Sequence, residues 1–284
     1  MVAPKKKQSK QKIVWSVVGI IIVAVFVIGI VNMSNNKKVS SEKNKTKKLS
    51  ILTYANWNPF EFVNNGKVVG FDLDLLKALS KEAGYDYTVK NTGWDAMFTQ
   101  LHSGSVDAAI SGITITSDRQ KSYDFSNPYF VSRQAIVTKK DNTSIKTALD
   151  LKGKKIAVQT GSTGQAAAES ILGKHNSNIS ADNGGTTNLQ VVHGQATAAI
   201  GDETTVTKYV ASNPSYNLKI IYDDKNFKPE YFGMMFPKNS PYRSDYNTAL
   251  KKIIDNGEYT KIYLKWFDNK PALNLIKARQ GGSK

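Results

Sequence analysis

The sequence predicts an α/β protein, because strand-like and helix-like segments alternate along most of its length. Residues 49–54 form a short apolar run typical of a buried strand, and residues 72–83 place apolar side chains at helical spacing. The same alternation returns after residue 144, and polar residues follow several strand ends. Such a pattern favours sheets whose strands run largely parallel, with helices packed on their faces.

The first half of the chain supplies strands and helices in a regular order. Gly84 and Gly104 follow the two helical runs, where glycine commonly ends a helix, and the Asn-Asn-Gly-Lys run at 64–67 is typical of a hairpin turn. The predicted elements are strand 49–54, turn 64–67, helix 72–83, strand 85–90, helix 94–102 and a strand ending at 108–110.

The second half repeats the pattern after a long extended run at 129–138. Gly257 separates the last two helical runs. The predicted elements are helix 145–151, strand 155–159, helix 163–172, helix 188–193, strand 198–200, helix 203–212, strand 218–222, strand 232–236, helix 242–256 and helix 259–267.

Composition and charge exclude several classes of function. With 284 residues and 40% apolar side chains, the chain can bury a sizeable core. The formal charge of +16 is concentrated in residues 1–48, which hold eleven Lys and one Glu, so the remainder carries only about +6. We therefore expect no nucleic-acid binding. Because the chain has no Cys, it has no disulfides, thiolate metal sites or Cys-linked lipid anchor.

The N-terminal segment has the pattern of a membrane anchor. Residues 13–31 are uncharged and long enough to cross a bilayer, and the Lys-rich leader 1–12 before them suits a cytoplasmic flank. Residues 32–48 are polar and Lys-rich, as expected of a flexible linker. A cleaved signal peptide is the alternative, although its apolar region is usually shorter and ends in small residues.

The stretch Ser111–Arg119 is the strongest candidate for a binding site. Ser, Gly and Thr residues follow a buried strand there and expose hydroxyl and N–H groups at its end. Arg119 would bring a planar fork of donors to the same place, which suits bidentate capture of a carboxylate. The residues alone leave a second interpretation equally open, in which the Thr residues are ordinary strand surface and Arg119 is a solvated charge.

A resemblance to a known family adds to this interpretation. The run SGITITSDRQKSYDFSNPY at 111–129 resembles the signature of the polar amino-acid-binding proteins of ABC importers, the family 3 bacterial extracellular solute-binding proteins. Supporting motifs in the family's order are NPFEF at 58–62, GFDLDL at 70–75, WDAMF at 94–98, GSTG at 161–164, Asp202 and KWF at 265–267.

The resemblance implies a two-lobed periplasmic-binding-protein-like (type II) fold behind the N-terminal transmembrane helix. Its hinge would consist of two crossing strands near 129–133 and 230–234. The first lobe would comprise 49–133, the second lobe 134–229, the return to the first lobe 230–270, and the C-terminal tail 271–284. Ligands of such folds collect where strand ends face each other across the cleft.

The resemblance also implies roles for individual residues. Arg119 and Thr114 would bind the carboxylate of an amino acid, Thr163 would add a contact from a helix start, and Asp202 would bind the ammonium. A simple N-cap is the alternative for Thr163 and Asp202. Ser111 and Gly112 would add hydrogen-bond acceptors. An aromatic pair, Trp57 and Trp94, would lie on both sides of the ligand side chain. The alternative for the two Trp residues is that each is packed in a core or exposed singly.

Two positions at which this sequence departs from the family's pattern predict the side chain of the ligand. Many relatives carry an acid at Tyr54, and a basic or small residue at Gln159. Tyr54 and Gln159 offer neutral donors and acceptors, so we expect a glutamine-like polar amino acid to bind more tightly than arginine or lysine. Cationic ligands stay open, because Trp faces attract cations and because an acid (Glu61, Asp95 or Glu230) could reach the pocket from a loop.

The expected function is that of an extracytoplasmic receptor, a monomer that delivers its ligand to an ABC permease and its ATPase. No catalytic constellation, cofactor or metal is expected, because the three His residues are scattered and read as surface residues. An enzyme on the same fold, resembling cyclohexadienyl dehydratases, and a ligand-sensing ectodomain are the alternatives.

If residues 13–31 remain as an anchor, the mature protein keeps its original N-terminus. Mass spectrometry of the membrane fraction should then find a first peptide that begins at Met1 or Val2. A mature N-terminus between Asn32 and Ser40 would instead identify a cleaved signal peptide.

Overall fold

The computed structural model describes Val2 and residues 47–280. Most of the leader, anchor and linker expected at 1–12, 13–31 and 32–48 therefore lies outside the described residues. Within the described part of the chain, no helix is long and apolar enough to cross a membrane.

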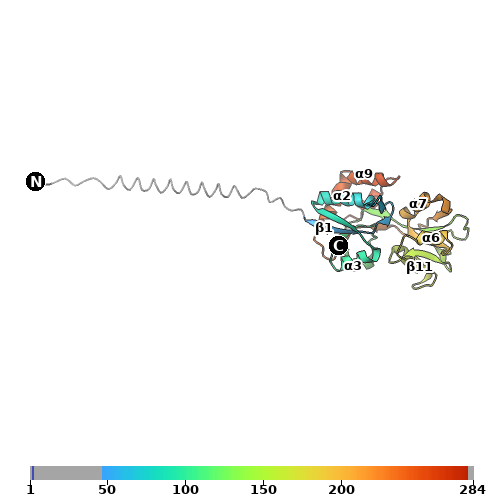
Figure 1. Cartoon of the computed structure of the whole chain (residues 1–284). Coiled ribbons are helices and arrows are strands. Elements are labelled where there is room, and N and C mark those ends of the chain that lie inside the picture. The colour runs from blue at the N-terminus through green and yellow to red at the C-terminus, as the bar shows by residue number, and fades with distance from the viewer. Residues whose placement is uncertain (1, 3–46, 281–284) are drawn as a thin grey trace. The chain divides into compact units, whose positions relative to one another are not determined.

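The first lobe is built on a five-stranded sheet with the order β5-β1-β6-β15-β7. Its central strand pairs are parallel, whereas the strand that returns from the second lobe, β15, runs antiparallel to both neighbours. Figure 1 shows the blue N-terminal and red C-terminal elements side by side in this lobe. The elements are β1 (Lys48–Thr53), β2 (Asn56–Trp57), β3 (Glu61–Asn64), β4 (Lys67–Val69), α2 (Phe71–Ala83), β5 (Asp86–Asn91), α3 (Trp94–His102), β6 (Ala108–Ala109), α4 (Ser117–Ser122), β7 (Tyr123–Phe125), β15 (Met235–Pro237), α8 (Arg243–Asp255), α9 (Glu258–Trp266) and α10 (Leu273–Lys277).

The second lobe repeats this architecture with a sheet of the order β11-β10-β12-β9-β13. β10 is parallel to β11 and β12, and β9 is antiparallel to β12 and β13. The elements are β9 (Gln134–Lys139), the 3-10 turn η1 (Ala148–Leu151), β10 (Ile156–Gln159), α5 (Thr163–Leu172), β11 (Ile179–Asp182), α6 (Thr187–Val192), β12 (Ala198–Asp202), α7 (Glu203–Ser212), the 3-10 turn η2 (Pro214–Tyr216) and β13 (Leu218–Ile221).

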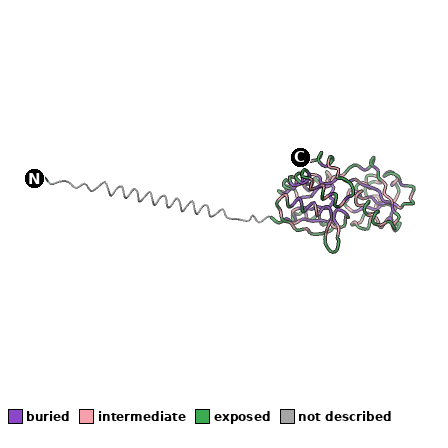
Figure 2. Tube along the Cα trace, turned by 90° about the horizontal axis from the view of Figure 1, so that it is seen from above, coloured by how far each residue is buried: buried purple, intermediate pink, exposed green. Residues whose placement is uncertain are grey.

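Each sheet is buried on both faces, which explains the continuous apolar runs in the sequence. In β1, Leu49 and Ile51 pack with residues of α2, α8 and α9, whereas Leu52 packs on the opposite face with Trp94 and Met97 of α3. The second lobe has the same two-sided arrangement. Figure 2 shows the buried strands in purple at the centre of each lobe.

Two short strands carry the chain between the lobes. β8 (Phe130–Ser132) leads from β7 into β9, and β14 (Glu230–Phe232) leads back from β13 to β15. They pair antiparallel, with Ser132 opposite Glu230. Thr114 forms a bridge with Phe232, so the polar stretch after β6 is attached to this crossing.

The structure corrects three predicted elements. The extended run 129–138 and the strand 232–236 are each broken in two, because the chain changes from the hinge pair to a lobe sheet at Arg133 and at Gly233. The helix predicted at 145–151 is only the turn η1, in which Asp150 accepts hydrogen bonds from the backbone N–H groups of Lys146 and Thr147. The short elements β11, α4 and α10 had no signal strong enough to predict them.

Candidate functional site

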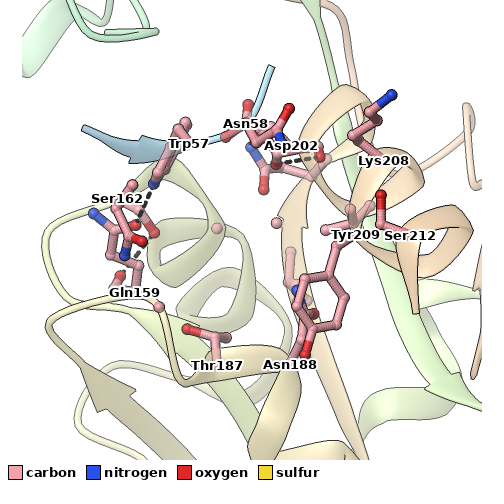
Figure 3. A pocket seen from close by; sticks show the side chains of 18 of the residues that line it. Trp57, Asn58, Gln159, Ser162, Thr187, Asn188, Asp202, Lys208, Tyr209 and Ser212 are labelled. Carbon is pink, nitrogen blue, oxygen red and sulfur yellow. Dashed lines mark hydrogen bonds between the residues drawn. The ribbon is translucent and has the colours of Figure 1, made fainter. Parts of the chain in front are cut away.

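The ten residues selected from the sequence meet where the two lobes face each other. Four hydrogen-bond contacts cross between the lobes at this place, from Tyr54, Trp57, Thr114 and Arg119. A pocket of about 270 Å³ opens beside them, and its lining includes Trp57, Gln159 and Asp202. Figure 3 shows this pocket, with Gln159 and Ser162 on one side and Tyr209 and Ser212 on the opposite side.

Arg119 connects the lobes at the centre of the site. Its Nη1 donates to the carbonyl of Thr114 at 2.8 Å, and its Nη2 donates to the carbonyl of Gly161 in the second lobe at 3.0 Å. The guanidinium also lies over the rings of Trp94 and Phe98, 5.5 and 5.2 Å from their centroids. Burial lowers the pKa of Arg119 to about 10, against the opposing effect of nearby carboxylates, so the group stays positive at neutral pH.

Thr114 and Thr163 bring hydroxyl groups from opposite lobes to the same point. Their Oγ1 atoms are 3.5 Å apart. The N-cap alternative for Thr163 is wrong, because Ser162 is the N-cap of α5 and accepts a hydrogen bond from the N–H of Gln165. The Thr163 hydroxyl is therefore not used as a cap, and it instead donates to Glu230 Oε2 at 2.7 Å and accepts from Gln134 Nε2 at 3.1 Å.

Asp202 occupies the N-cap position of α7, but its side chain makes no capping hydrogen bond. Its Oδ1 instead accepts from Nε2 of Gln134 at 3.4 Å, and the residue is only 4% exposed. Burial, followed by repulsion from Glu230, raises the pKa of Asp202 well above its ordinary value, while Arg119 partly opposes this. A cation placed against Asp202 would stabilise its charged form.

Ser111 and Gly112 are held from behind by two buried acids. The Ser111 hydroxyl donates to Glu61 Oε1 at 2.9 Å, and the N–H of Gly112 donates to Asp72 Oδ2 at 2.8 Å. Asp72 Oδ2 also accepts from the hydroxyl of Tyr129 at 2.9 Å. All of these contacts lie on the side of the stretch that faces the core.

The two buried acids each leave one oxygen without a partner among the described residues, Glu61 Oε2 and Asp72 Oδ1. Both side chains are fully buried, and one proton between them would satisfy both oxygens and remove one of two like charges, so we infer that the acids share a proton. Burial, followed by the charge of Asp72, raises the pKa of Glu61 well above its ordinary value. Burial also raises the pKa of Asp72, to about 6, although three hydrogen bonds to its carboxylate counteract this. Glu61 is therefore the acid and Asp72 the carboxylate.

Trp57 and Trp94 lie with parallel faces, as an aromatic pair around a ligand side chain would. Their planes differ by 9° and their centroids are 5.9 Å apart. Two ring contacts with a flat group placed between the faces require about 7 Å, because each contact takes about 3.5 Å. Because the spacing of the planes cannot exceed the distance between the centroids, a flat ligand group fits between them only after the rings separate by at least about 1 Å.

Tyr54 and Gln159 close the far end of the site together with a loop of the second lobe. The Tyr54 hydroxyl donates to the carbonyl of Asn183 at 2.8 Å, and Gln159 Oε1 accepts from Trp57 Nε1 at 3.1 Å. An indole N–H only donates, so this contact fixes the orientation of the Gln159 amide. Its Nε2 is buried and has no partner within the described residues.

The loop after β11 was not anticipated from the sequence. Asp182 holds it by accepting from the N–H of Gly184 at 2.7 Å and from Nε2 of Gln190 at 2.8 Å. Gly185 has φ 86°, and a Cβ built on it would lie 2.6 Å from Asn56 Nδ2, so only glycine allows this close approach. The Gly-Gly pair at 184–185 was the available signal.

Gln134 was also missed, because nothing in its local sequence distinguishes it. Only the strand register places it opposite Asp202. Its Nε2 lies within hydrogen-bonding distance of Thr163, Asp202 and Glu230. The three His residues are exposed, as expected, and no group of side chains suited to a metal ion occurs within residues 47–280.

The shared proton should make stability depend on pH. The folded protein keeps this proton at a higher pH than the unfolded chain does, so the pair's contribution is complete below about pH 4 and declines as pH rises toward the folded pKa of Glu61. The slope reaches at most about 1.4 kcal/mol per pH unit. Glu61→Gln keeps the hydrogen bonds to Ser111 and Asp72 without the titration, so its unfolding free energy should decline less between pH 5 and 8.

Urea unfolding at several pH values measures this difference. Glu82→Gln serves as the control, because Glu82 forms a surface ion pair with Lys252. It should retain the pH slope of the original protein. Parallel pH curves for the Glu61→Gln variant and the original protein would rule out the shared proton.

Comparisons with known proteins agree with the two-lobed fold. Residues 49–269 match the bacterial extracellular solute-binding proteins, family 3. The arginine-binding extracellular protein ArtP of Bacillus subtilis is 34% identical over 229 residues, 80% of this chain and 89% of ArtP.

Two solved structures are similar over the same region. The arginine-, lysine-, histidine-binding protein ArtJ from Geobacillus stearothermophilus is 47% identical with a TM-score of 0.79, over 81% of this chain and 100% of ArtJ. An ancestral arginine-binding protein bound to glutamine is 38% identical with a TM-score of 0.72, over 78% and 98% of the two chains. The chain therefore belongs to the bacterial extracellular solute-binding proteins, family 3, and is an amino-acid-binding receptor of ABC import rather than an enzyme.

Proposed function

We propose that the chain binds a free amino acid between its lobes through Arg119, Thr114, Thr163 and Asp202. The observation that carries this proposal is the convergence of one half-buried cation, two hydroxyls and one buried acid from both lobes at one point. An amino acid offers a carboxylate and an ammonium, so a general site needs this combination of charges. Closure of the lobes around the ligand would create the shape that a permease recognises.

The roles follow from the charges. Arg119 and the two hydroxyls bind the α-carboxylate, and Asp202 binds the α-ammonium with help from the carbonyl of Gly112. The Ser111 hydroxyl is occupied by Glu61 and by the N–H of Tyr54, so it supports the site from behind. Trp57 and Trp94 then enclose the side chain, which extends toward Tyr54 and Gln159. The lobes, 49–133 with 230–270 and 134–229, move about β8 and β14.

The side-chain end of the site favours a ligand with a hydrogen-bond acceptor. Gln159 Nε2 is a buried donor without a partner in the part of the chain that the structure describes, and leaving such a donor unpaired costs about 1–3 kcal/mol. The carbonyl of a glutamine side chain satisfies it, whereas a guanidinium or ammonium group has no acceptor to offer. We propose a neutral polar amino acid, with glutamine as the representative ligand.

Arginine is the competing ligand. ArtP and ArtJ are named for arginine binding, and the carbonyl of Asn183 and the Trp faces suit a guanidinium. The Gln159 amide distinguishes the two ligands, because its unpaired Nε2 donor can bond to the side-chain carbonyl of glutamine but not to a guanidinium, which has no acceptor.

The cellular context follows from the family and from the N-terminal sequence. We propose that residues 13–31 anchor the chain in the membrane, that residues 32–48 tether the binding domain on the extracytoplasmic side, and that a monomer delivers its ligand to an ABC permease with its ATPase.

Arg119→Ala tests the carboxylate contact. Removing the cation leaves the ligand carboxylate without its charged partner, so the amino acid should bind more weakly by about 3 kcal/mol, roughly a hundredfold. Isothermal calorimetry measures the affinity and circular dichroism checks the fold. Lys121→Ala is the control, because Lys121 is exposed and pairs with Asp118. Unchanged affinity in Arg119→Ala would refute the role.

Competition between L-glutamine and L-arginine tests the ligand. A thermal-shift screen of the twenty amino acids comes first, because a ligand that binds only the folded state raises the melting temperature. Glutamine should have the lower dissociation constant. Gln159→Leu should weaken glutamine binding about tenfold and leave arginine binding unweakened, since only glutamine accepts from Nε2. The exposed Gln195 supplies the control, Gln195→Leu. Tighter binding of arginine to the original protein would decide for the competing ligand.

A further inference from the structure

Glu230 holds the hydroxyl groups that the proposed function assigns to the ligand carboxylate. Its Oε2 accepts from Thr163 Oγ1 at 2.7 Å and from Thr114 Oγ1 at 3.0 Å. It also accepts from Gln134 Nε2 at 3.3 Å. One carboxylate oxygen therefore receives hydrogen bonds from both lobes, and Arg119 attracts it through space.

The hinge fixes the backbone from which Glu230 projects. β14 pairs with β8 on one side, while on the other the N–H of Ile115 donates to the carbonyl of Tyr231 at 2.8 Å. Thr114 lies in the same bridge, opposite Phe232. The backbones of Glu230 and Thr114 therefore keep a fixed relation, so rotation of a side chain is needed to take the carboxylate away from the Thr114 hydroxyl, whereas separation of the lobes also takes it away from Thr163.

Glu230 is also in conflict with a neighbouring charge. Its Oε2 and Asp202 Oδ1 share one donor group, Gln134 Nε2, and each carboxylate repels the other. Two like charges close enough to share one hydrogen-bond donor are unfavourable in a partly buried site. Glu230 is half-buried, so an outward rotation of its side chain would relieve this repulsion and return the carboxylate to solvent.

We propose that Glu230 acts as an intramolecular substitute for the ligand's α-carboxylate, bridging Thr114 and Thr163 until an amino acid displaces it. This inference rests on the proposed function, since it assumes that the ligand carboxylate uses the same hydroxyls. The displacement exchanges one carboxylate for another and needs no proton. Glu230 thereby lowers the apparent affinity for the amino acid and holds the lobes together before the ligand binds.

The sign of a single substitution tests the proposal. If Glu230 competes with the ligand, Glu230→Gln should bind it about tenfold more tightly, because a neutral amide holds the hydroxyls less well and the binding-competent fraction rises. If Glu230 instead joins Asp202 as a partner of the ligand ammonium, the same variant binds more weakly. Weaker or unchanged binding overturns the proposal.

Calorimetry of the full-length chain with L-glutamine and L-arginine measures the effect, after co-purified ligand has been removed by unfolding and refolding. Glu258→Gln is the matched control, because it removes the same charge from the start of α9, and its affinity should equal that of the original protein. A different result would contradict the proposed function itself. In that case neither the original protein nor Glu230→Gln binds any of the twenty amino acids, although Glu258→Gln folds normally.

A second measurement needs no ligand. Because the chain has no Cys, Ser122→Cys in the first lobe and Lys174→Cys in the second can carry a fluorescent donor and acceptor on exposed positions. Without amino acid, Glu230→Gln should show lower energy transfer than the original protein, since the bridge between Thr114 and Thr163 is weakened and the lobes separate. Equal energy transfer in both proteins would overturn the role of Glu230 in holding the lobes.

Discussion

The pairing of β8 with β14 is the constraint on which the rest of the structure depends. These two short strands are the only segments of residues 47–280 that pass between the lobe sheets, and their register places Glu230 opposite Ser132. The bridge from Thr114 to Phe232 then attaches the polar stretch after β6 to the same crossing. A rotation about the crossing changes the gap between the lobes while each sheet and its two apolar clusters move as a unit.

Behind the cleft, the polar groups are oriented by hydrogen bonds to buried side chains and not by solvent. Ser111 and Gly112 are buried and donate hydrogen bonds to Glu61 and Asp72. A buried pair of acids that shares one proton carries a single charge, and that charge is held by the hydroxyl of Tyr129 and the N–H of Gly112. The arrangement fixes the orientation of the stretch before any ligand arrives, which reduces the entropy that binding must cost.

The proposed selectivity end of the site consists of segments far apart in the chain. Tyr54 follows β1, Gln159 ends β10, and Asn183 belongs to the loop that Asp182 folds over them. The Trp57 indole N–H fixes the orientation of the Gln159 amide and leaves its Nε2 without a partner among the described residues. A change in any of these contacts would alter the side-chain preference while leaving the contacts to the α-groups in place, which is consistent with relatives of one fold that are named for different amino acids.

The sequence by itself determined the α/β pattern, most helices and strands, and the residues that we propose for the α-groups, because periodicity, caps and motifs are local. Helices α3, α5 and α7 have the predicted bounds. It did not determine where the extended runs break, because Arg133 and Gly233 change sheets only in the context of the hinge. Only the tertiary structure decided that Gln134 lies opposite Asp202, that Glu61 and Asp72 share a proton, and that Glu230 reaches Thr114 and Thr163. These contacts join residues separated by up to 116 positions, and such proximity arises from strand register and lobe packing, which no local pattern encodes.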